Sequence, residues 1–142
     1  MVPKLFIDSD VVIDFFTDRK PHANPASELF ELNERGNIEL YLSAVSINNI
    51  YYIVRKYLGH SKTIAVIEEL TRMTEIIGTS KKEIIQALKN DFKYFEDSIQ
   101  YSSALTIKDV KAIVTRNVKD YKNSEIAVLT PSIYLKMTKN EN

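Results

Sequence analysis

The sequence contains no cysteine, and this absence excludes three kinds of chemistry. Disulfide bonds, zinc sites with cysteine ligands and thiol nucleophiles all require that residue. The two histidines, His22 and His60, lie far apart in the chain. Any metal site must therefore be built mainly from oxygen ligands, which favours Mg²⁺ or Mn²⁺.

Long hydrophobic runs and a net charge are also missing. No apolar run approaches the roughly 18 residues that a membrane-spanning helix needs, and residues 1–7 are too short and too weakly basic for a secretory signal. We therefore expect a cytoplasmic protein without membrane contact. With 19 basic and 19 acidic residues, no overall field attracts nucleic acid. The local excess of cations between Lys108 and Lys122 is typical of a solvated surface.

Glycine and proline are scarce, with three and four residues, and no segment has the composition of a linker. We expect a single domain over residues 1–142, since 44% of the residues are hydrophobic and can form one core. Apolar runs predict strands at 4–7, 38–42, 75–77, 112–115 and 126–129. Helical spacing predicts helices at 43–59, 61–73, 80–90 and 95–105, and one that begins at Pro131. This alternation predicts an α/β fold with three α/β/α layers and a central parallel sheet of about five strands.

Three aspartates follow the first predicted strand in the stretch FIDSDVVID. Asp8 leaves the strand at its carboxyl end, where ligands of open parallel sheets bind. A carboxylate there suits a divalent cation, although Asp8 or Ser9 could instead simply cap the following helix. Asp14 lies within that helix, and we expect it to be exposed.

A second acidic pair, Glu96 and Asp97, begins the helix predicted at 95–105. An acid near a helix N-terminus gains some stability from the helix dipole, so this pair has a structural explanation too. Adjacent helical residues point about 100° apart, so we expect only one of the two to face the crevice. The small residues that follow on its face favour Asp97.

The segment Thr115-Arg-Asn-Val-Lys-Asp-Tyr121 follows the fourth predicted strand. Its threonine, amide and aspartate could complete an oxygen-lined site, and Arg116 and Lys119 could reach phosphate groups. Taken alone, the segment could also be an ordinary polar loop. Together with the other two groups of acids, it favours a metal site.

Asp8-Ser-Asp10 is also similar to the opening motif of haloacid-dehalogenase-type phosphatases. That family has a paired acidic motif after a later strand, whereas the fourth strand here ends in Thr-Arg-Asn. A response-regulator receiver fits less well, because the third strand ends in Ile77-Gly-Thr79 without a phosphate-accepting aspartate. The phosphatase remains a remote alternative.

Over nearly its whole length, the sequence resembles the PIN-domain family, and in particular its VapC-like branch of toxin ribonucleases. The motifs that carry the resemblance are FIDSDVVID at 6–14, LSAVSINNI at 42–50, FEDSIQYSSA at 95–104, TRNVKDY at 115–121 and LTP at 129–131. No single motif is specific, but their order and spacing together are. The resemblance implies a parallel-sheet fold and Mg²⁺- or Mn²⁺-dependent cleavage of RNA.

The resemblance also assigns roles to residues. It makes Asp8 and Asp97 catalytic acids and metal ligands, and either Asn117 or Asp120 the variable fourth position. The family's second acid is a glutamate, and the matching position here is Asn49, which can offer a carbonyl oxygen but no charge. The resemblance makes Asp10 the polar residue two positions after the first acid, and we assign it to substrate binding. As a hypothesis from the residues themselves, we also assign Arg116, Lys119 and Arg55 to substrate binding, where they would hold the RNA backbone.

These roles imply an endoribonuclease that is the toxin of a toxin-antitoxin pair. Because of Asn49, the alternative is a catalytically weakened PIN module that binds RNA or a partner protein. The helix predicted at 43–59 has more apolar residues than one buried face requires. We therefore expect a homodimer and an antitoxin contact in this region, unless the helix is buried on both sides within the monomer.

Overall fold

The computed structural model describes residues 1–140, so the last two residues of the predicted 1–142 domain lie outside it. Its strands are β1 (Lys4–Ile7), β2 (Glu39–Ser43), β3 (Glu75–Ile77), β4 (Val110–Val114) and β5 (Ala127–Leu129). They form one sheet in the order β3-β2-β1-β4-β5, and every neighbouring pair is parallel. The predicted parallel sheet of about five strands is confirmed.

The helices are α1 (Ser9–Phe16), α2 (Ala23–Glu34), α3 (Ala44–Met73), α4 (Lys81–Lys89), α5 (Phe95–Ala104) and α6 (Pro131–Asn140). A short 3₁₀ helix, η1 (Val118–Tyr121), follows β4. The two helices predicted at 43–59 and 61–73 together form α3, which is interrupted at Gly59 with φ 80° and ψ 171°. Glycine adopts such a positive φ without steric cost. Within residues 1–140, no helix is long and apolar enough to cross a membrane.

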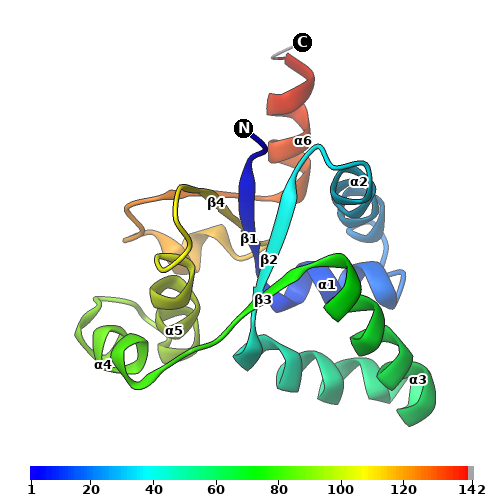
Figure 1. The fold of residues 1–142 in the computed structure, drawn as a ribbon, viewed down its shortest axis with the longest axis horizontal. Helices are drawn as coiled ribbons and strands as arrows, with labels where there is room; N and C mark the ends of the chain where they lie inside the picture. The colour runs from blue at the N-terminus through cyan, green and yellow to red at the C-terminus, as the bar shows by residue number, and fades with distance from the viewer. Residues whose placement is uncertain (141–142) are drawn as a thin grey trace.

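Alternating side chains on the central strands join the sheet to a helical layer on each face. On β1, Leu5 and Ile7 belong to one buried cluster, with residues of α1, α2, α3 and α6, whereas Phe6 belongs to the other, with residues of α5 and η1. Successive residues of a strand point to opposite faces. Figure 1 shows α4 and α5 on one side of the sheet and α1, α2 and α3 on the other. The predicted three-layer α/β/α arrangement is confirmed.

The order of the strands places a crevice at the carboxyl ends of β1 and β4. The chain moves outward from β1 through β2 to β3, and then returns to the other side of β1 to form β4 and β5 (Figure 1). Ligands of open α/β sheets bind where the strand order reverses in this way. Asp8 follows β1 and Thr115 follows β4, so both residues lie at this reversal point.

Candidate active site

A cleft of about 520 Å³ lies at the carboxyl ends of β1 and β4, between the N-terminal parts of α1, α3 and α5. Six residues assigned to the site from the sequence line it: Asp8, Asp10, Asn49, Asp97, Arg116 and Asn117. These residues come from four separate segments of the chain. The structure therefore brings together most of the side chains that the sequence singled out.

Asp8 is both a helix cap and a cleft residue. It is 9% exposed, and its Oδ1 accepts a hydrogen bond from the backbone N–H of Ser9 at 2.8 Å, which caps α1. Its Oδ2 accepts bonds from the hydroxyl of Thr115 at 2.9 Å and from that of Tyr121 at 3.3 Å. The capping role and the cleft position, which were alternatives in the sequence, therefore coexist in one carboxylate.

Asp10 lies beside Asp8 and has one oxygen without a partner. Its Oδ2 accepts a hydrogen bond from the backbone N–H of Arg116 at 3.0 Å. Its Oδ1 is buried and is the only such side-chain atom in residues 1–140 that has no hydrogen-bond partner. Burial, and then the charge of Asp8, raise the pKa of Asp10 from 3.8 to about 7. The backbone N–H and the charge of Arg116 act in the opposite direction, but they do not offset the effect of burial on the pKa of Asp10.

Asp97 approaches the cleft from the first turn of α5. Burial, followed by the charges of Asp8 and Asp120, raises its pKa from 3.8 to about 6, while a hydrogen bond from Tyr121 acts in the opposite direction. Burial raises the pKa of Tyr121 above its usual value, so its hydroxyl stays protonated as a donor. The exposed Glu96 also lines the cleft, so the expectation that only one of the two acids faces it is wrong.

The donor set of the cleft fits a hard divalent cation. Mg²⁺ and Mn²⁺ prefer carboxylate and amide oxygens, and the unpartnered Oδ1 of Asp10 is such an oxygen. Repulsion from Asp8 contributes to the raised pKa values of both Asp10 and Asp97, and a cation would relieve it. Within the described chain, however, no three Asp, Glu or His side chains form a group that could hold one ion. The acids surround the cleft without converging on a single point.

A buried polar network fixes the start of α3 against α5. Gln100 accepts a hydrogen bond from the hydroxyl of Ser43 at 2.6 Å and donates one to that of Ser46 at 2.5 Å. Ser43 also caps α3 by accepting a bond from the backbone N–H of Ser46. This arrangement holds the first turns of α3 beside the carboxylates. Asn49 lies there, exposed and lining the cleft.

Asp14 is buried, and the expectation that it is exposed is wrong. Only 1% of the residue is accessible, because α1 packs against both α2 and α3. Its carboxylate accepts hydrogen bonds from Arg116, at 2.6 Å from Nε and 3.3 Å from Nη2. A buried carboxylate requires such a partner. Arg116 is therefore not part of a plain solvated surface, unlike the exposed lysines around it.

Three other residues assigned from the sequence lie outside the cleft lining. Lys119 and Asp120 line a neighbouring hollow of about 480 Å³, although Asp120 is close enough to affect the pKa of Asp97. Arg55 is exposed on α3, with its guanidinium 5.6 Å and 5.9 Å from the ring centroids of Tyr51 and Tyr52. The structure thus places Asn117, and not Asp120, in the cleft itself.

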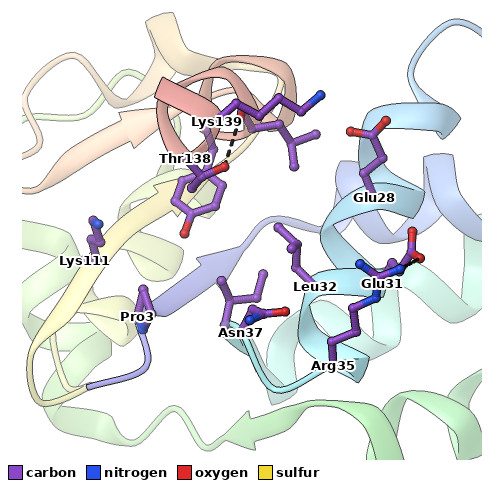
Figure 2. A pocket seen from close by; sticks show the side chains of 12 residues that line it. Pro3, Glu28, Glu31, Leu32, Arg35, Asn37, Lys111, Thr138 and Lys139 are labelled. Atoms are coloured by element: carbon purple, nitrogen blue, oxygen red, sulfur yellow. Dashed lines mark hydrogen bonds and ion pairs between the residues drawn. The ribbon is translucent and has the colours of Figure 1, made fainter. Parts of the chain in front are cut away.

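A slightly larger hollow of about 580 Å³ lies at the amino ends of the strands, at the other end of the sheet from the cleft. Figure 2 shows Glu28 on α2, and Arg35 directly after that helix, across the hollow from Thr138 and Lys139 on α6. Arg35 is paired with Glu31 of α2 at 2.6 Å. This hollow is near the amino ends of the strands, whereas ligands of open α/β sheets bind at the carboxyl ends. The smaller cleft is therefore the better candidate for the active site.

The raised pKa values predict how stability depends on pH. The unfolded chain releases the protons of Asp10 and Asp97 near pH 4, whereas the folded chain holds them until about pH 7 and 6. Between these values the folded state binds more protons, so the free energy of unfolding falls as the pH rises. Melting curves of metal-free protein should show Asp10→Asn gaining stability relative to wild type between pH 4 and 7. Parallel pH profiles for the two proteins would contradict this.

Comparison with known protein families identifies the family of this chain. A family model of the PIN domain matches residues 4–119. The chain belongs to the PIN domain family, as the sequence motifs predicted. No curated protein sequence matches it significantly.

Solved structures extend the comparison to the fold. A DNA-bound VapBC complex from Salmonella typhimurium contains a similar chain, with a TM-score of 0.67, 18% identity, and 92% of this chain and 99% of that chain covered. A toxin-antitoxin complex from Klebsiella pneumoniae gives a TM-score of 0.65 at 22% identity, with 89% and 97% covered. VapC20 from Mycobacterium tuberculosis, a toxin that cleaves the sarcin-ricin loop, gives 0.61 at 12% identity, with 77% and 86% covered. The fold is therefore VapC-like.

Proposed function

We propose that this protein is a metal-dependent endoribonuclease that hydrolyses RNA phosphodiester bonds in the cytoplasm, as the toxin of a toxin-antitoxin pair. The observation that carries the proposal is the cleft at the strand reversal, which Asp8, Asp10 and Asp97 all line and in which one buried carboxylate oxygen is unpartnered. The PIN match and the cleavage of the sarcin-ricin loop by a structural relative support it. The PIN match over residues 4–119 also argues against the remote alternative, a haloacid-dehalogenase-type phosphatase.

Asp8 and Asp97 would hold Mg²⁺ or Mn²⁺, with Asn49, Asn117 and Asp120 completing the ligand set directly or through water. The bound cation would supply an activated water and offset the charge that develops on the phosphate. Thr115 and Tyr121 orient Asp8 by donating to its Oδ2. Arg116 holds the RNA backbone at the cleft, and Lys119 and Arg55 contact it further away, which gives affinity without sequence selectivity.

Asn49 favours a second candidate function, a weakened PIN module that binds RNA or a partner protein without cutting. The cleft has an amide where the family has a glutamate, so it carries one negative charge fewer. The acids are also not gathered on one point within the described residues. These two observations would be expected of a site that binds metal weakly.

Turnover of a panel of structured and single-stranded RNAs, with and without Mg²⁺ or Mn²⁺, separates the two functions. The nuclease predicts cleavage products that appear only with metal. The module predicts RNA or protein binding without cleavage under any metal condition. Purification without metal followed by chelation provides the baseline for both.

An antitoxin and a second copy of the chain are the proposed protein partners. Several structural relatives are toxin-antitoxin complexes, which supports an antitoxin. On α3, Ile50 and Val54 are fully buried, whereas Tyr52 and Tyr57 are 54% and 60% exposed. The helix is therefore not buried on both sides within the monomer. Exposed aromatic side chains of this kind are enriched at interfaces.

We expect the isolated protein to sediment as a dimer at high micromolar concentration. Tyr57→Glu should shift the equilibrium towards monomer, because a charge would replace an aromatic contact in the interface. Tyr94→Glu is the matched control, since Tyr94 is 48% exposed and lies between α4 and α5. A wild-type monomer at this concentration, or an equal effect of both substitutions, would argue against a dimer through α3.

A further inference from the structure

The buried carboxylate of Asp14 holds two arginines. It accepts two hydrogen bonds from Arg116, at 2.6 Å and 3.3 Å, in the forked geometry that makes such pairs strong. The Nε of Arg19 lies 3.9 Å from Asp14 Oδ1, the oxygen that also accepts from Arg116 Nη2, so this second contact is a longer ion pair. The backbone N–H of Arg19 also donates to the carbonyl of Asp14 at 3.1 Å. One anion thus fixes two cations from different parts of the chain.

Both arginines line the cleft that contains the catalytic candidates. Their side chains are 28% exposed for Arg116 and 42% exposed for Arg19. Arg19 is held from a second side, because its Nη2 donates to the hydroxyl of Tyr57 at 3.3 Å. A guanidinium has five N–H donors, so both arginines keep donors free for a ligand after these contacts. The cations are therefore accessible and already oriented.

The charges of this group do not cancel. Two guanidinium groups and one carboxylate leave a net charge of +1 at the wall of a cleft that otherwise carries carboxylates. A pair that only stabilised the fold would need one arginine to neutralise Asp14. Buried ion pairs also give little net stability compared with apolar packing. The second arginine is therefore more than Asp14 itself requires.

We propose that Arg19 and Arg116 form a phosphate-binding site for the backbone of single-stranded RNA, and that Asp14 positions them. This inference rests on the proposed function and deepens it by naming where the substrate phosphate binds. A guanidinium pair matches the oxygens of a phosphodiester, and Arg116 connects the site to the chemistry through its backbone N–H on Asp10. The phosphate then lies between the arginines and the carboxylates.

The salt dependence of RNA binding tests the two contacts directly. The probe is a fluorescein-labelled oligouridylate in EDTA, so that cleavage does not interfere, and its affinity is measured by anisotropy over a KCl series. Each phosphate contact on a single strand contributes about 0.7 to the slope of log affinity against log salt. Arg19→Ala should therefore lower the slope by about 0.7, and so should Arg116→Ala.

Arg35→Ala is the matched control for both arginine variants. Arg35 is also exposed and paired with a carboxylate, Glu31, but it lies near the amino ends of the strands, away from the cleft. Its replacement removes the same charge from the protein and should leave the slope unchanged. A drop in slope equal to that of Arg19→Ala would show that only the total charge matters, which would overturn the inference.

Asp14→Asn tests the positioning role by the sign of its effect. The substitution raises the net charge of the protein by one, so simple electrostatic attraction predicts tighter RNA binding. If Asp14 positions the arginines, binding should weaken, because both cations lose their anchor. The comparison is made at a temperature where melting curves show the variant folded. Tighter binding would overturn the positioning role, and the Arg19 result stands independently of it.

The outcomes separate this inference from the nuclease proposal. Protein that binds RNA through Arg19 and Arg116 but never cleaves it would support the phosphate site and reject the nuclease. Protein that cleaves RNA, with Arg19→Ala and Arg35→Ala indistinguishable in slope, would support the nuclease and reject the phosphate site. Wild-type protein that fails to bind the oligouridylate even at low salt would overturn this inference.

Discussion

Replacing Asp8 with asparagine should abolish metal-dependent RNA cleavage and leave the fold intact. The variant keeps an oxygen for the cap on Ser9, and its amide can donate to the hydroxyls of Thr115 and Tyr121 in place of the bonds that Asp8 accepts. It loses the charge that contributes to the raised pKa values of Asp10 and Asp97. The repulsion within the cleft therefore falls, and the melting temperature of metal-free protein should stay equal or rise.

Asp109→Asn is the matched control for Asp8→Asn. Asp109 is exposed, precedes β4 at the other end of the sheet, and has a φ of 61°, which asparagine tolerates well. Cleavage rates and melting curves of the two variants are compared with wild type. Unfolding of Asp8→Asn by several kcal/mol, on the scale of a disrupted core, would mean that Asp8 is mainly structural. Undiminished cleavage by the variant would remove Asp8 from the active site.

The parallel sheet could be predicted because its strands are short, apolar and separated by helical patterns. The predicted bounds of the first and third strands, at 4–7 and 75–77, agree with β1 and β3. Parallel strands buried on both faces read as continuous apolar runs, and the carboxyl ends of such strands meet at one edge. This geometry brings Asp8 and Thr115 together across 107 positions of sequence.

Neither the pairing of Asp14 with Arg116 nor the existence of helix α2 was predicted from the sequence. Five of the eight residues of α1 are buried, and Asp14 is one of them. The run SDVVIDFF carries part of that signal, because an acid among Val, Ile and Phe residues of a short helix is buried only with a partner. The partner, Arg116, is 102 positions away, and local patterns cannot identify it.

In α2, the residues Ala26, Leu29 and Phe30 are buried at spacings of three and four. This spacing is typical of an amphipathic helix. Pro25 near the start of the segment makes the pattern short, and the helix is amphipathic over only two turns. The sequence signal was therefore present but weak. The contacts of α2 with α1 and α6, which bury that stripe, depend on tertiary structure.

The exposure of Asn49 sharpens the prediction for this position. An asparagine buried in a helix contact could not become a glutamate without leaving an unpaired buried charge. Asn49 is instead exposed and lines the cleft, on a helix whose start is fixed by Ser43, Ser46 and Gln100. Asn49→Glu should therefore change the free energy of unfolding by less than about 0.5 kcal/mol, as surface substitutions usually do.

Asn49→Glu should tighten Mg²⁺ or Mn²⁺ binding by about tenfold and raise cleavage if the natural protein is slow. Two unit charges about 4 Å apart at an effective dielectric near 20 interact by roughly 4 kcal/mol, and about a third of this is enough for a tenfold change after desolvation. Calorimetric titration of metal into both proteins measures the difference. Asn140→Glu, at the last residue of α6, adds the same charge and should leave metal affinity unchanged. If Asn49→Glu gains no metal affinity over that control, Asn49 does not lie beside the metal, and its match to the family's glutamate is wrong.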